Sequence, residues 1–325
     1  MQYELAVFSG SSNPKLSRLI AKHLNMKLGS VFLKTFPSGE KFCQYGDNIR
    51  GKDVFIIQSV DWPVNENLME LMIMIDAARR ASAARITAVL PYFGYARQDR
   101  KTSARTPISA RLVVDMLETA GADRIMTMDL HAGQIQGFTN LPFDHLFPTQ
   151  EFITAFNSSE TDKENLIVFG PDVGSAKRAT AFAELLGCDM GIVIKKRKSD
   201  ENVEVQGVVG DPMGKDIILV DDMTESLGTL LEAAKTIKAN GGKSVRVMVT
   251  HGIFTPTAIE RIVLAERHKY IDEIYCTNTT AVRMGDDLGK FVPLKTLDVS
   301  AIFGEAIRRT NNNESISTLF PFNGF

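Results

Sequence analysis

The sequence predicts an α/β protein with two similar domains, each built on a parallel sheet flanked by helices. Short apolar runs alternate with amphipathic helical patterns along the chain, which favours strand–helix–strand units with right-handed crossovers. Several apolar runs show no polar alternation, as is typical of parallel strands covered on both faces. The length of 325 residues is more than one hydrophobic core usually serves, so two domains are expected.

The expected strands are short runs of apolar and β-branched residues, and the expected helices repeat apolar residues at helical spacing. In chain order the strands are Leu5–Phe8, Val54–Gln58, Ile86–Leu90, Ile125–Met128, Leu166–Phe169, Ile192–Ile194, Ile217–Val220, Val245–Val249 and Ile271–Cys276. The helices are Asn67–Ala81, Pro107–Thr119, Gly174–Leu186, Gly228–Asn240 and a final one at Ser300–Thr310. Gly241 and Gly242 follow the fourth helix and form a good stop signal.

The two halves of the chain echo each other. Residues 51–59 read GKDVFIIQS and residues 214–222 read GKDIILVDD, and each stretch is expected to open a strand that leads to a helix and another strand. The best linker or surface-loop candidate is the polar stretch 157–165. We place the domain border just before it, near Phe147. The expected domains are therefore 1–147 and 148–299, with the C-terminal region 300–325 packing back on the first.

Composition excludes several kinds of partner. The formal net charge of −2 gives no global reason to bind nucleic acid or an anionic membrane. No apolar run is long enough to span a membrane, and the N-terminus carries Glu4 and no basic stretch, so it is interpreted as a strand and not a signal peptide. The three cysteines form no C-x-x-C pair, which argues against zinc and fits a reducing compartment. We expect a cytoplasmic protein without nucleic-acid or membrane partners.

The most informative motif is the segment 217–229. Its apolar strand ends in Asp221 and Asp222, and a short loop with Ser226, Gly228 and Thr229 then opens a helix. Ligands of open α/β sheets bind at the carboxyl ends of strands, and a helix start offers free N–H groups to a phosphate. Paired carboxylates can bind ribose hydroxyls directly or through Mg²⁺. The alternative is a capped helix after a buried strand with surface acids, but the two adjacent acids favour a sugar-phosphate site.

Two further loops carry groups that suit a nucleotide. The aromatic loop 91–100 contains Arg97, which can bind phosphate oxygens bidentately, and Gln98, which can read a base or ribose. A solvated turn whose aromatic residues pack is an equally good interpretation of this loop alone. The segment 36–40 is by itself only a turn, because Pro37 and Gly39 set a loop and Phe36 can be a core residue.

Three other features have an ordinary explanation beside a functional one. His131 follows an apolar strand, and a lone histidine is more often structural than a ligand. Asp172 follows another strand and can simply cap the next helix, in which Lys177 and Arg178 can be ordinary solvated residues. The basic run 195–198 is most simply a solvated hairpin.

Together these blocks resemble the ribose-phosphate pyrophosphokinase family, also called phosphoribosyl diphosphate synthetases. The pattern Val-Asp-Asp-Met-x-x-x-x-Gly-Thr at 220–229 is similar to the ribose-phosphate loop of this family and of type I phosphoribosyltransferases. The blocks at 65–71, 91–100, 128–138 and 304–310 select the synthetase family, and the similarity covers nearly the whole chain. The resemblance implies that each domain has a type I phosphoribosyltransferase-like fold.

The resemblance also implies an activity and a set of site residues. The activity is transfer of diphosphate from ATP to the 1-hydroxyl of ribose 5-phosphate, with Mg²⁺ as cofactor. The implied ATP-binding residues are Phe36, Ser38, Gly39, Glu40, Arg97 and Gln98, of which the first four reach a neighbouring subunit. The implied ribose 5-phosphate residues are Arg197, Asp221, Asp222, Glu225, Ser226, Leu227, Gly228 and Thr229. His131 and Asp172 match the metal-site residues, and Lys195 and Arg197 match catalytic residues of a mobile flap.

The chain departs from the family pattern in two loops. Pro37 and Ser38 stand where the family has Ser-Asp, which removes an acid from the adenine loop. Glu225 and Ser226 replace Asp-Thr and keep the charge and the hydroxyl. Leu227 replaces a small residue, and we expect its bulk beside the phosphate to weaken the affinity for ribose 5-phosphate.

The resemblance is to the common class of the family. Its members are homo-oligomers, namely hexamers, that phosphate activates and ADP inhibits. Four residues match polar positions of its regulatory site, namely Arg50, Ser82, Arg105 and Ser315, while Asn48 replaces a usual serine. Two other functions stay open. A phosphoribosyltransferase would use the same sugar-phosphate loop, and a non-catalytic homologue would regulate an active synthetase.

Overall fold

The computed structural model describes residues 3–157, 165–197 and 203–319, and these form two compact units. Unit 1 comprises the described residues of Met1–Phe147, Thr279–Ala281 and Val299–Gly324, and unit 2 those of Pro148–Asn278 and Val282–Asp298. The short segment Thr279–Ala281 and Val299 therefore belong to unit 1, although the sequence places them within the expected second domain. Most of the expected linker at 157–165 lies outside the described residues.

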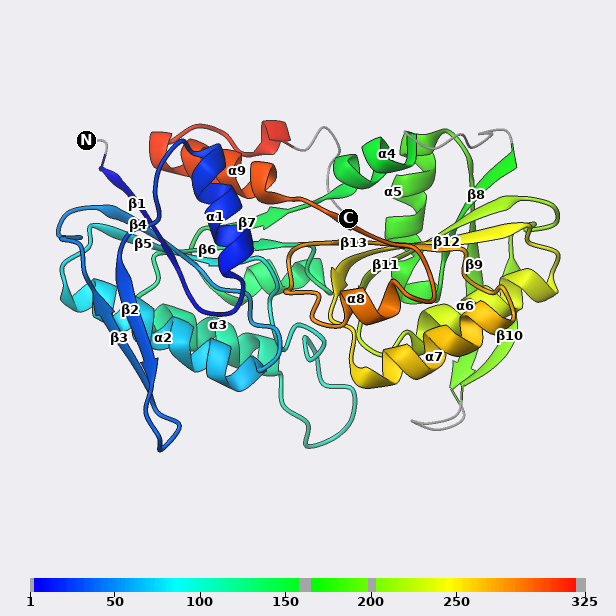
Figure 1. The fold of residues 1–325 in the computed structure, drawn as a ribbon, viewed down its shortest axis with the longest axis horizontal. Helices are drawn as coiled ribbons and strands as arrows, with labels where there is room; N and C mark the ends of the chain where they lie inside the picture. Colours follow the sequence, from blue (N-terminus) through cyan, green and yellow to red (C-terminus); the bar gives the residue numbers. More distant parts are fainter. Residues whose placement is uncertain (1–2, 158–164, 198–202, 320–325) are drawn as a thin grey trace. The chain divides into compact units, whose positions relative to one another are not determined.

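Unit 1 is built on a parallel sheet of five strands in the order β1-β4-β5-β6-β7. The strands are β1 (Leu5–Ser9), β4 (Asp53–Ile57), β5 (Arg85–Leu90), β6 (Arg124–Met128) and β7 (Phe143–Leu146). An antiparallel hairpin of β2 (Val31–Thr35) and β3 (Lys41–Tyr45) forms a separate two-stranded sheet. The hairpin appears as a long projection beside α2 in Figure 1.

Helices cover both faces of this sheet (Figure 1). Val7, Phe55 and Ile57 pack against α1 (Pro14–His23) and α9 (Ser300–Asn312). Side chains at the alternate strand positions pack against α2 (Val64–Arg80) and α3 (Ser109–Ala120). Two 3-10 helices, η1 (Gly133–Phe138) and η4 (Ser317–Leu319), complete the unit. Because every second side chain points to the opposite face, apolar residues fill both sides of each strand.

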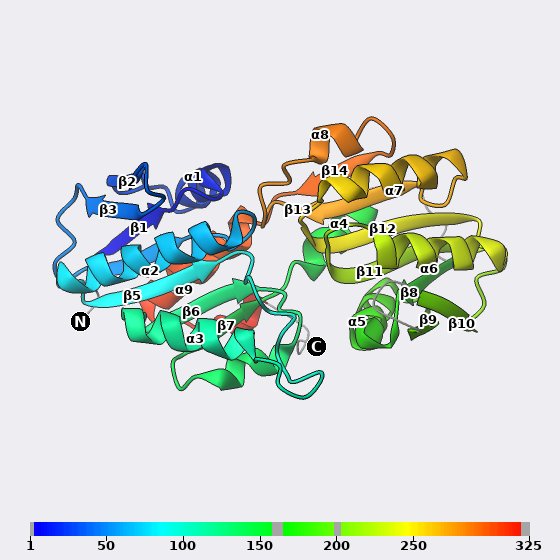
Figure 2. The same ribbon diagram turned by 90° about the horizontal axis from the view of Figure 1, so that it is seen from below.

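Unit 2 has a seven-stranded sheet in the order β10-β9-β8-β11-β12-β13-β14, in which only the β9–β10 pair is antiparallel. Its strands are β8 (Leu166–Gly170), β9 (Asp189–Arg197), β10 (Val203–Val209), β11 (Asp216–Thr224), β12 (Ser244–Gly252), β13 (Glu273–Thr277) and β14 (Leu294–Leu297). Its helices are α4 (Thr149–Asn157), α5 (Ala176–Leu186), which follows η3 (Val173–Ser175), α6 (Gly228–Ala239), α7 (Pro256–Arg267) and α8 (Gly285–Leu288). The α4 and α5 helices pack on one face of the sheet and α6 and α7 on the other (Figure 1). In the view from below, α6 and α7 lie in front of the strands (Figure 2).

The sequence echo between the halves corresponds to a shared local structure. Gly51 and Gly214 both adopt positive φ, and each donates its N–H, at 2.9 Å, to a carbonyl just after the helix that follows. Gly51 bonds Ser82 O after α2, and Gly214 bonds Gly241 O after α6. Glycine is favoured at both positions because a left-handed conformation strains other residues. The α/β class with parallel sheets, predicted from the sequence, is confirmed.

All nine predicted strands and all five predicted helices occur, with shifted ends. The sequence analysis missed β2, β3, β7, β10 and β14, and also α1, α4, α7 and the short α8. Among the helices that the structure describes, none is long and apolar enough to cross a membrane.

Candidate functional site

The carboxyl end of β11 and the start of α6 form the first part of the site. The β8 strand pairs with β11 only from Asp216 to Leu219, whereas β12 follows it as far as Thr224. The last residues of β11 therefore extend beyond β8 at the edge of the sheet where ligands of open α/β folds bind. Asp221 and Asp222 lie in this extension, as the sequence predicts.

Acidic side chains gather at this edge. Asp222 is 4% exposed and donates its N–H to Asp221 Oδ1 at 3.0 Å. Burial and the neighbouring charge of Asp222 raise the pKa of Asp221 well above its ordinary value; Arg178 opposes this rise and Asp172 adds to it. The carboxyl groups of Asp222 and Asp172 thus disfavour ionisation of Asp221, with one guanidinium as partial compensation. A cation or sugar hydroxyls would relieve this repulsion.

Asp172 has the capping role that the sequence left open. Its carboxylate accepts a hydrogen bond of 3.2 Å from Ser175 N, and the Ser175 hydroxyl donates to Asp172 O at 2.8 Å. The cap fixes the loop between β8 and α5, and Arg178 lies in the first turn of that helix. Arg178 is more than the ordinary solvated residue that the sequence left open, because it is half-buried and acts electrostatically on Asp221.

The backbone carbonyls of the loop after β11 are already occupied. Thr224 O accepts from Ile253 N at 3.0 Å, and Glu225 O accepts from Thr255 N at 2.8 Å. Ser226 O accepts from Arg261 Nη1 at 3.1 Å. The loop is therefore held by its carbonyls from the side of β12 and α7. The start of α6 follows this loop, and the backbone N–H groups at a helix N-terminus suit an anion.

Leu227 does not have the role expected of it. Its side chain is 1% exposed and lies in the hydrophobic core with Leu230 and Leu231 of α6. Its N–H donates to Thr224 Oγ1 at 3.2 Å and its carbonyl accepts from Leu231 N at 2.8 Å. The expected bulk beside the phosphate is therefore wrong, because the left-handed backbone at Leu227 (φ +60°) directs this side chain into the core. Leu227 shapes the loop and offers it no free donor.

In unit 1, the loops after β5 and β6 meet at the carboxyl edge of the sheet. Gln98 accepts hydrogen bonds from the start of α3, through its side chain from the Ser109 hydroxyl and through its carbonyl from Ala110 N. Asp99 accepts from Gln134 of η1 at 2.7 Å. This hydrogen bond from Gln134 to Asp99 joins the loop that carries Arg97 and Gln98 to η1, which begins two residues after His131. Arg97 and His131 are both exposed.

The predicted adenine loop is the tip of the β2–β3 hairpin. Phe36 is 38% exposed, and Lys34 Nζ lies 4.9 Å from the centre of its ring. Phe36 is therefore not a core residue. The Ser38 hydroxyl donates to the carboxylate of Glu40 at 2.9 Å. Ser38, which replaces the aspartate of the family pattern, therefore binds the one acid left in this loop. Gly39 has φ +94° and open space around it.

The basic run and the metal residues can be placed only in part. Lys195 and Arg197 lie in β9, which pairs with β10 in the antiparallel ribbon, but their side chains lie outside the described part of the chain. His131 belongs to unit 1 and Asp172 to unit 2. Among the described residues, no three His, Cys, Asp or Glu side chains form a preassembled metal cage.

Carboxylates nevertheless fit the implied cofactor. Mg²⁺ prefers oxygen ligands, usually takes one or two carboxylates from the protein, and keeps water and substrate oxygens for its other positions. Asp172, at the cap after β8, carries such oxygens and acts electrostatically on Asp221 at the end of β11.

Unit 1 has Gln58 and Ser59 at the position equivalent to Asp221 and Asp222 of unit 2. Gln58 is fully buried, accepts from the Ser12 hydroxyl at 2.8 Å and donates to Glu70 at 2.9 Å. Ser59 donates to Thr279 O at 2.5 Å. These side chains are bound to neighbours within unit 1, so this position lacks the paired acids that unit 2 has at 221–222.

The four predicted regulatory residues all lie in unit 1. Arg50 and Ser82 flank the same turn, because Gly51 N donates to Ser82 O at 2.9 Å. Arg105 adopts positive φ (+65°) in the exposed loop before α3. Ser315 follows α9, and its carbonyl accepts from Arg309 Nη1 at 2.9 Å.

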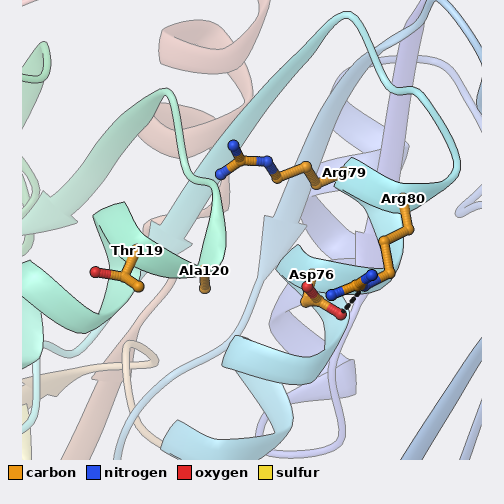
Figure 3. A pocket seen from close by; sticks show the side chains of 5 residues that line it. All are labelled: Asp76, Arg79, Arg80, Thr119 and Ala120. Carbon is orange, nitrogen blue, oxygen red and sulfur yellow. Dashed lines mark hydrogen bonds and ion pairs between the residues drawn. The ribbon is translucent and has the colours of Figure 1, made fainter.

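A hollow of about 370 Å³ lies between the ends of α2 and α3 (Figure 3). Arg79, Arg80, Thr119 and Ala120 line it together with Asp76, to which Arg80 donates a hydrogen bond of 2.8 Å. It contains none of the predicted site residues. Arginines in the last turn of a helix complement the helix dipole, which explains their presence without a ligand.

Two sequence profiles match the chain. One, described as the N-terminal domain of ribose phosphate pyrophosphokinase, matches residues 5–121. The other, described as a phosphoribosyl synthetase-associated domain, matches residues 205–321.

Full-length relatives and a solved structure agree with these profiles. Proteins named ribose-phosphate pyrophosphokinase from Rhizobium meliloti and Hyphomonas neptunium are 45% and 46% identical over 317 residues, which covers 97% of this chain and 100% and 99% of theirs. The crystal structure of phosphoribosylpyrophosphate synthetase from Mycobacterium smegmatis has a TM-score of 0.87 at 37% identity. It covers 95% of this chain, and 99% of that chain is matched.

Proposed function

The chain belongs to the ribose-phosphate pyrophosphokinase family, and from that premise we propose that the loop Val220–Thr229 is its ribose 5-phosphate site. The enzyme transfers the diphosphoryl group of ATP to the 1-hydroxyl of ribose 5-phosphate, which gives phosphoribosyl diphosphate and AMP. The observation that carries the site assignment is the loop after β11. Its carbonyls are bound on one side, two acids precede it, and a helix N-terminus follows.

Each part of the loop has a role in this proposal. The N–H groups of Gly228 and Thr229, with the hydroxyls of Ser226 and Thr229, bind the 5-phosphate at the positive end of α6. Asp221 and Asp222 accept hydrogen bonds from the ribose hydroxyls. The carboxylate of Glu225 lies on the same loop as a further acceptor.

The reaction is a displacement at the β-phosphorus of ATP. The oxygen of the sugar 1-hydroxyl forms a bond to this phosphorus, the bond to the oxygen bridging the α- and β-phosphates breaks, and AMP leaves with that oxygen. The hydroxyl proton passes to water or to a nearby carboxylate. Little covalent chemistry falls to the protein in such transfers, so positioning and charge neutralisation dominate.

The residues that bind the nucleotide and those that neutralise the phosphoryl charge are assigned by resemblance to the family. Phe36 stacks on adenine, and Arg97 and Gln98 contact the nucleotide from unit 1. Lys195 and Arg197 neutralise the charge that develops on the transferred group, which is most effective in a closed and drier site. By the same resemblance, His131 and Asp172 would hold Mg²⁺, and the ion would supply charge neutralisation on the ATP oxygens.

The finer biological setting is part of the same proposal. We expect a cytoplasmic homo-hexamer in which the β2–β3 hairpin reaches the nucleotide of a neighbouring subunit. Phosphate activates and ADP inhibits through Arg50, Ser82, Arg105 and Ser315. A phosphate titration that leaves the rate unchanged would contradict the regulatory part alone.

Initial-rate kinetics test the site assignment. Thr229→Val and Asp222→Asn should each raise the KM for ribose 5-phosphate by about tenfold or more. The first loses a hydrogen bond to the charged phosphate, and the second loses a charged acceptor for the ribose hydroxyls. The KM for ATP should change by less than about twofold. Unchanged KM values for the sugar phosphate in both variants would refute the assignment.

A further inference from the structure

Arg261 is a charged residue of unit 2 that neither the sequence motifs nor the family resemblance singles out. It lies on the second turn of α7, half-buried against the loop after β11. Its Nη1 donates to Ser226 O at 3.1 Å and to Ser226 Oγ at 2.5 Å. Within the described residues it has no carboxylate partner, so its charge is not neutralised by a neighbouring acid.

The bond to Ser226 Oγ determines what this hydroxyl can do. A guanidinium group only donates hydrogen bonds, so the serine oxygen must accept from Arg261. The single hydrogen of the Ser226 hydroxyl is then available for another acceptor, and a hydroxyl that accepts from a cation becomes a stronger donor. An acceptor in this position is what a phosphate oxygen provides.

Gly228 supplies a second and independent observation. A Cβ atom built on Gly228 would lie 2.5 Å from Arg261 Nη1 and 3.1 Å from its Cζ. The guanidinium therefore occupies the space that any side chain at position 228 would need. Its φ lies outside the range in which glycine is favoured by conformation, so the contact with Arg261 is what a side chain at position 228 would disturb, by pushing the guanidinium away from the loop.

From these contacts we propose that Arg261 is a positioning residue for the 5-phosphate of the sugar substrate. It holds the Ser226 carbonyl and hydroxyl from behind, so that the hydroxyl hydrogen and the first N–H groups of α6 point to one anion. Its charge also adds to the positive potential of the helix N-terminus. This inference rests on the proposed function, because it assigns a supporting residue to the same site.

The direct test replaces Arg261 by methionine and by lysine in the full-length enzyme. Arg267→Met is the matched control, because it removes the same charge from the exposed last turn of the same helix. Arg261→Met should raise the KM for ribose 5-phosphate about tenfold, the size expected for a lost charged hydrogen bond, with the KM for ATP changed less than about twofold. Arg261→Lys should recover part of the affinity because it keeps the charge. Arg267→Met should behave as wild type.

A double-mutant cycle with Ser226→Ala tests the mechanism. If Arg261 acts through the serine hydroxyl, the two substitutions together should raise the KM for the sugar phosphate by clearly less than the product of their separate effects. A fully multiplicative effect would overturn the inference. It would also be overturned if Arg261→Met left this KM unchanged, or raised the KM of both substrates equally together with a lowered melting temperature. Should Arg261→Met fail to fold, the cycle is run with Arg261→Lys, and the same criteria apply.

Failure of the inference and failure of the proposed function are distinguishable. A wild-type protein that forms no phosphoribosyl diphosphate contradicts the function itself. An active wild-type enzyme whose Arg261→Met variant has a normal KM for ribose 5-phosphate contradicts only the role of Arg261.

Discussion

Replacement of Leu227 by alanine separates the structural role of this residue from a role in binding. The Leu227 side chain is 1% exposed and packs in the core with residues of α6. Leucine and alanine suffer the same strain at φ +60°, so the change reports the lost packing alone. We expect the free energy of unfolding to fall by ~2–4 kcal/mol, the usual cost of truncating a buried leucine to alanine. A change to glycine would be a poorer probe, because glycine also removes the backbone strain.

Urea unfolding and initial-rate kinetics measure the two roles of Leu227 side by side. The KM for ribose 5-phosphate should stay within about twofold of wild type, since the side chain points away from the anion. Leu264→Ala is the control: this leucine of α7 is 38% exposed, and its loss should cost less than about 1 kcal/mol. A Leu227→Ala variant of normal stability with a clearly altered KM would refute this account of the loop.

Three other predictions concern Lys195, Asp221 and Cys276. Lys195→Ala should lower kcat by about two orders of magnitude or more with a modest change in ATP affinity, if the lysine stabilises charge only in the transition state, and near-normal turnover in a stopped-flow assay would contradict its role. Asp221→Asn should weaken ribose 5-phosphate binding and yet raise the melting temperature above pH 7. The raised pKa of Asp221 means that ionisation of this acid destabilises the fold as the pH rises through its folded-state pKa, so melting curves from pH 5 to 9 should be flatter in the variant, and parallel curves would argue against it. Burial raises the pKa of the Cys276 thiol to about 12, so a thiol reagent at pH 8 should modify Cys276 only after denaturation, and mass spectrometry of labelled peptides checks this.

The sequence predicted the sheets well because buried parallel strands are continuous apolar runs. The strand around Ile217–Val220 and its echo at 54–58 were recognised for this reason. The hairpin β2–β3 was missed because its residues are half-buried or exposed in alternation and include Lys34, Lys41 and Gln44. Such a hairpin has no continuous apolar pattern of its own. The short edge strand β14 was missed for a similar reason, since its burial is only partial.

Site residues could be proposed from the sequence where they are neighbours along the chain, but not where only the packing of the fold brings them together. Asp221, Asp222 and Gly228 belong to the strand and helix start that position them, so a local motif is enough to propose them as site residues. Arg261 is one of several charges on an ordinary amphipathic helix, and only the fold brings it to Ser226. No sequence signal would have selected it.

The direction of a side chain in a loop is also outside the reach of a sequence pattern. Leu227 was expected to crowd the phosphate because it follows Ser226 and precedes Gly228 in the binding loop. Its left-handed backbone conformation instead places it in the core. The φ angle of Leu227 thus changes its interpretation: the residue packs in the core and does not crowd the phosphate.

Phosphorus NMR of the intact enzyme with ATP, ribose 5-phosphate and Mg²⁺ tests the central claim most directly. Transfer of a diphosphoryl group predicts that the ATP resonances are replaced by those of AMP and of a sugar diphosphate coupled to carbon 1, in equal amounts. The same mixture without ribose 5-phosphate should remain unchanged. Formation of ADP with a new sugar monophosphate, or no reaction in the complete mixture, would contradict the account.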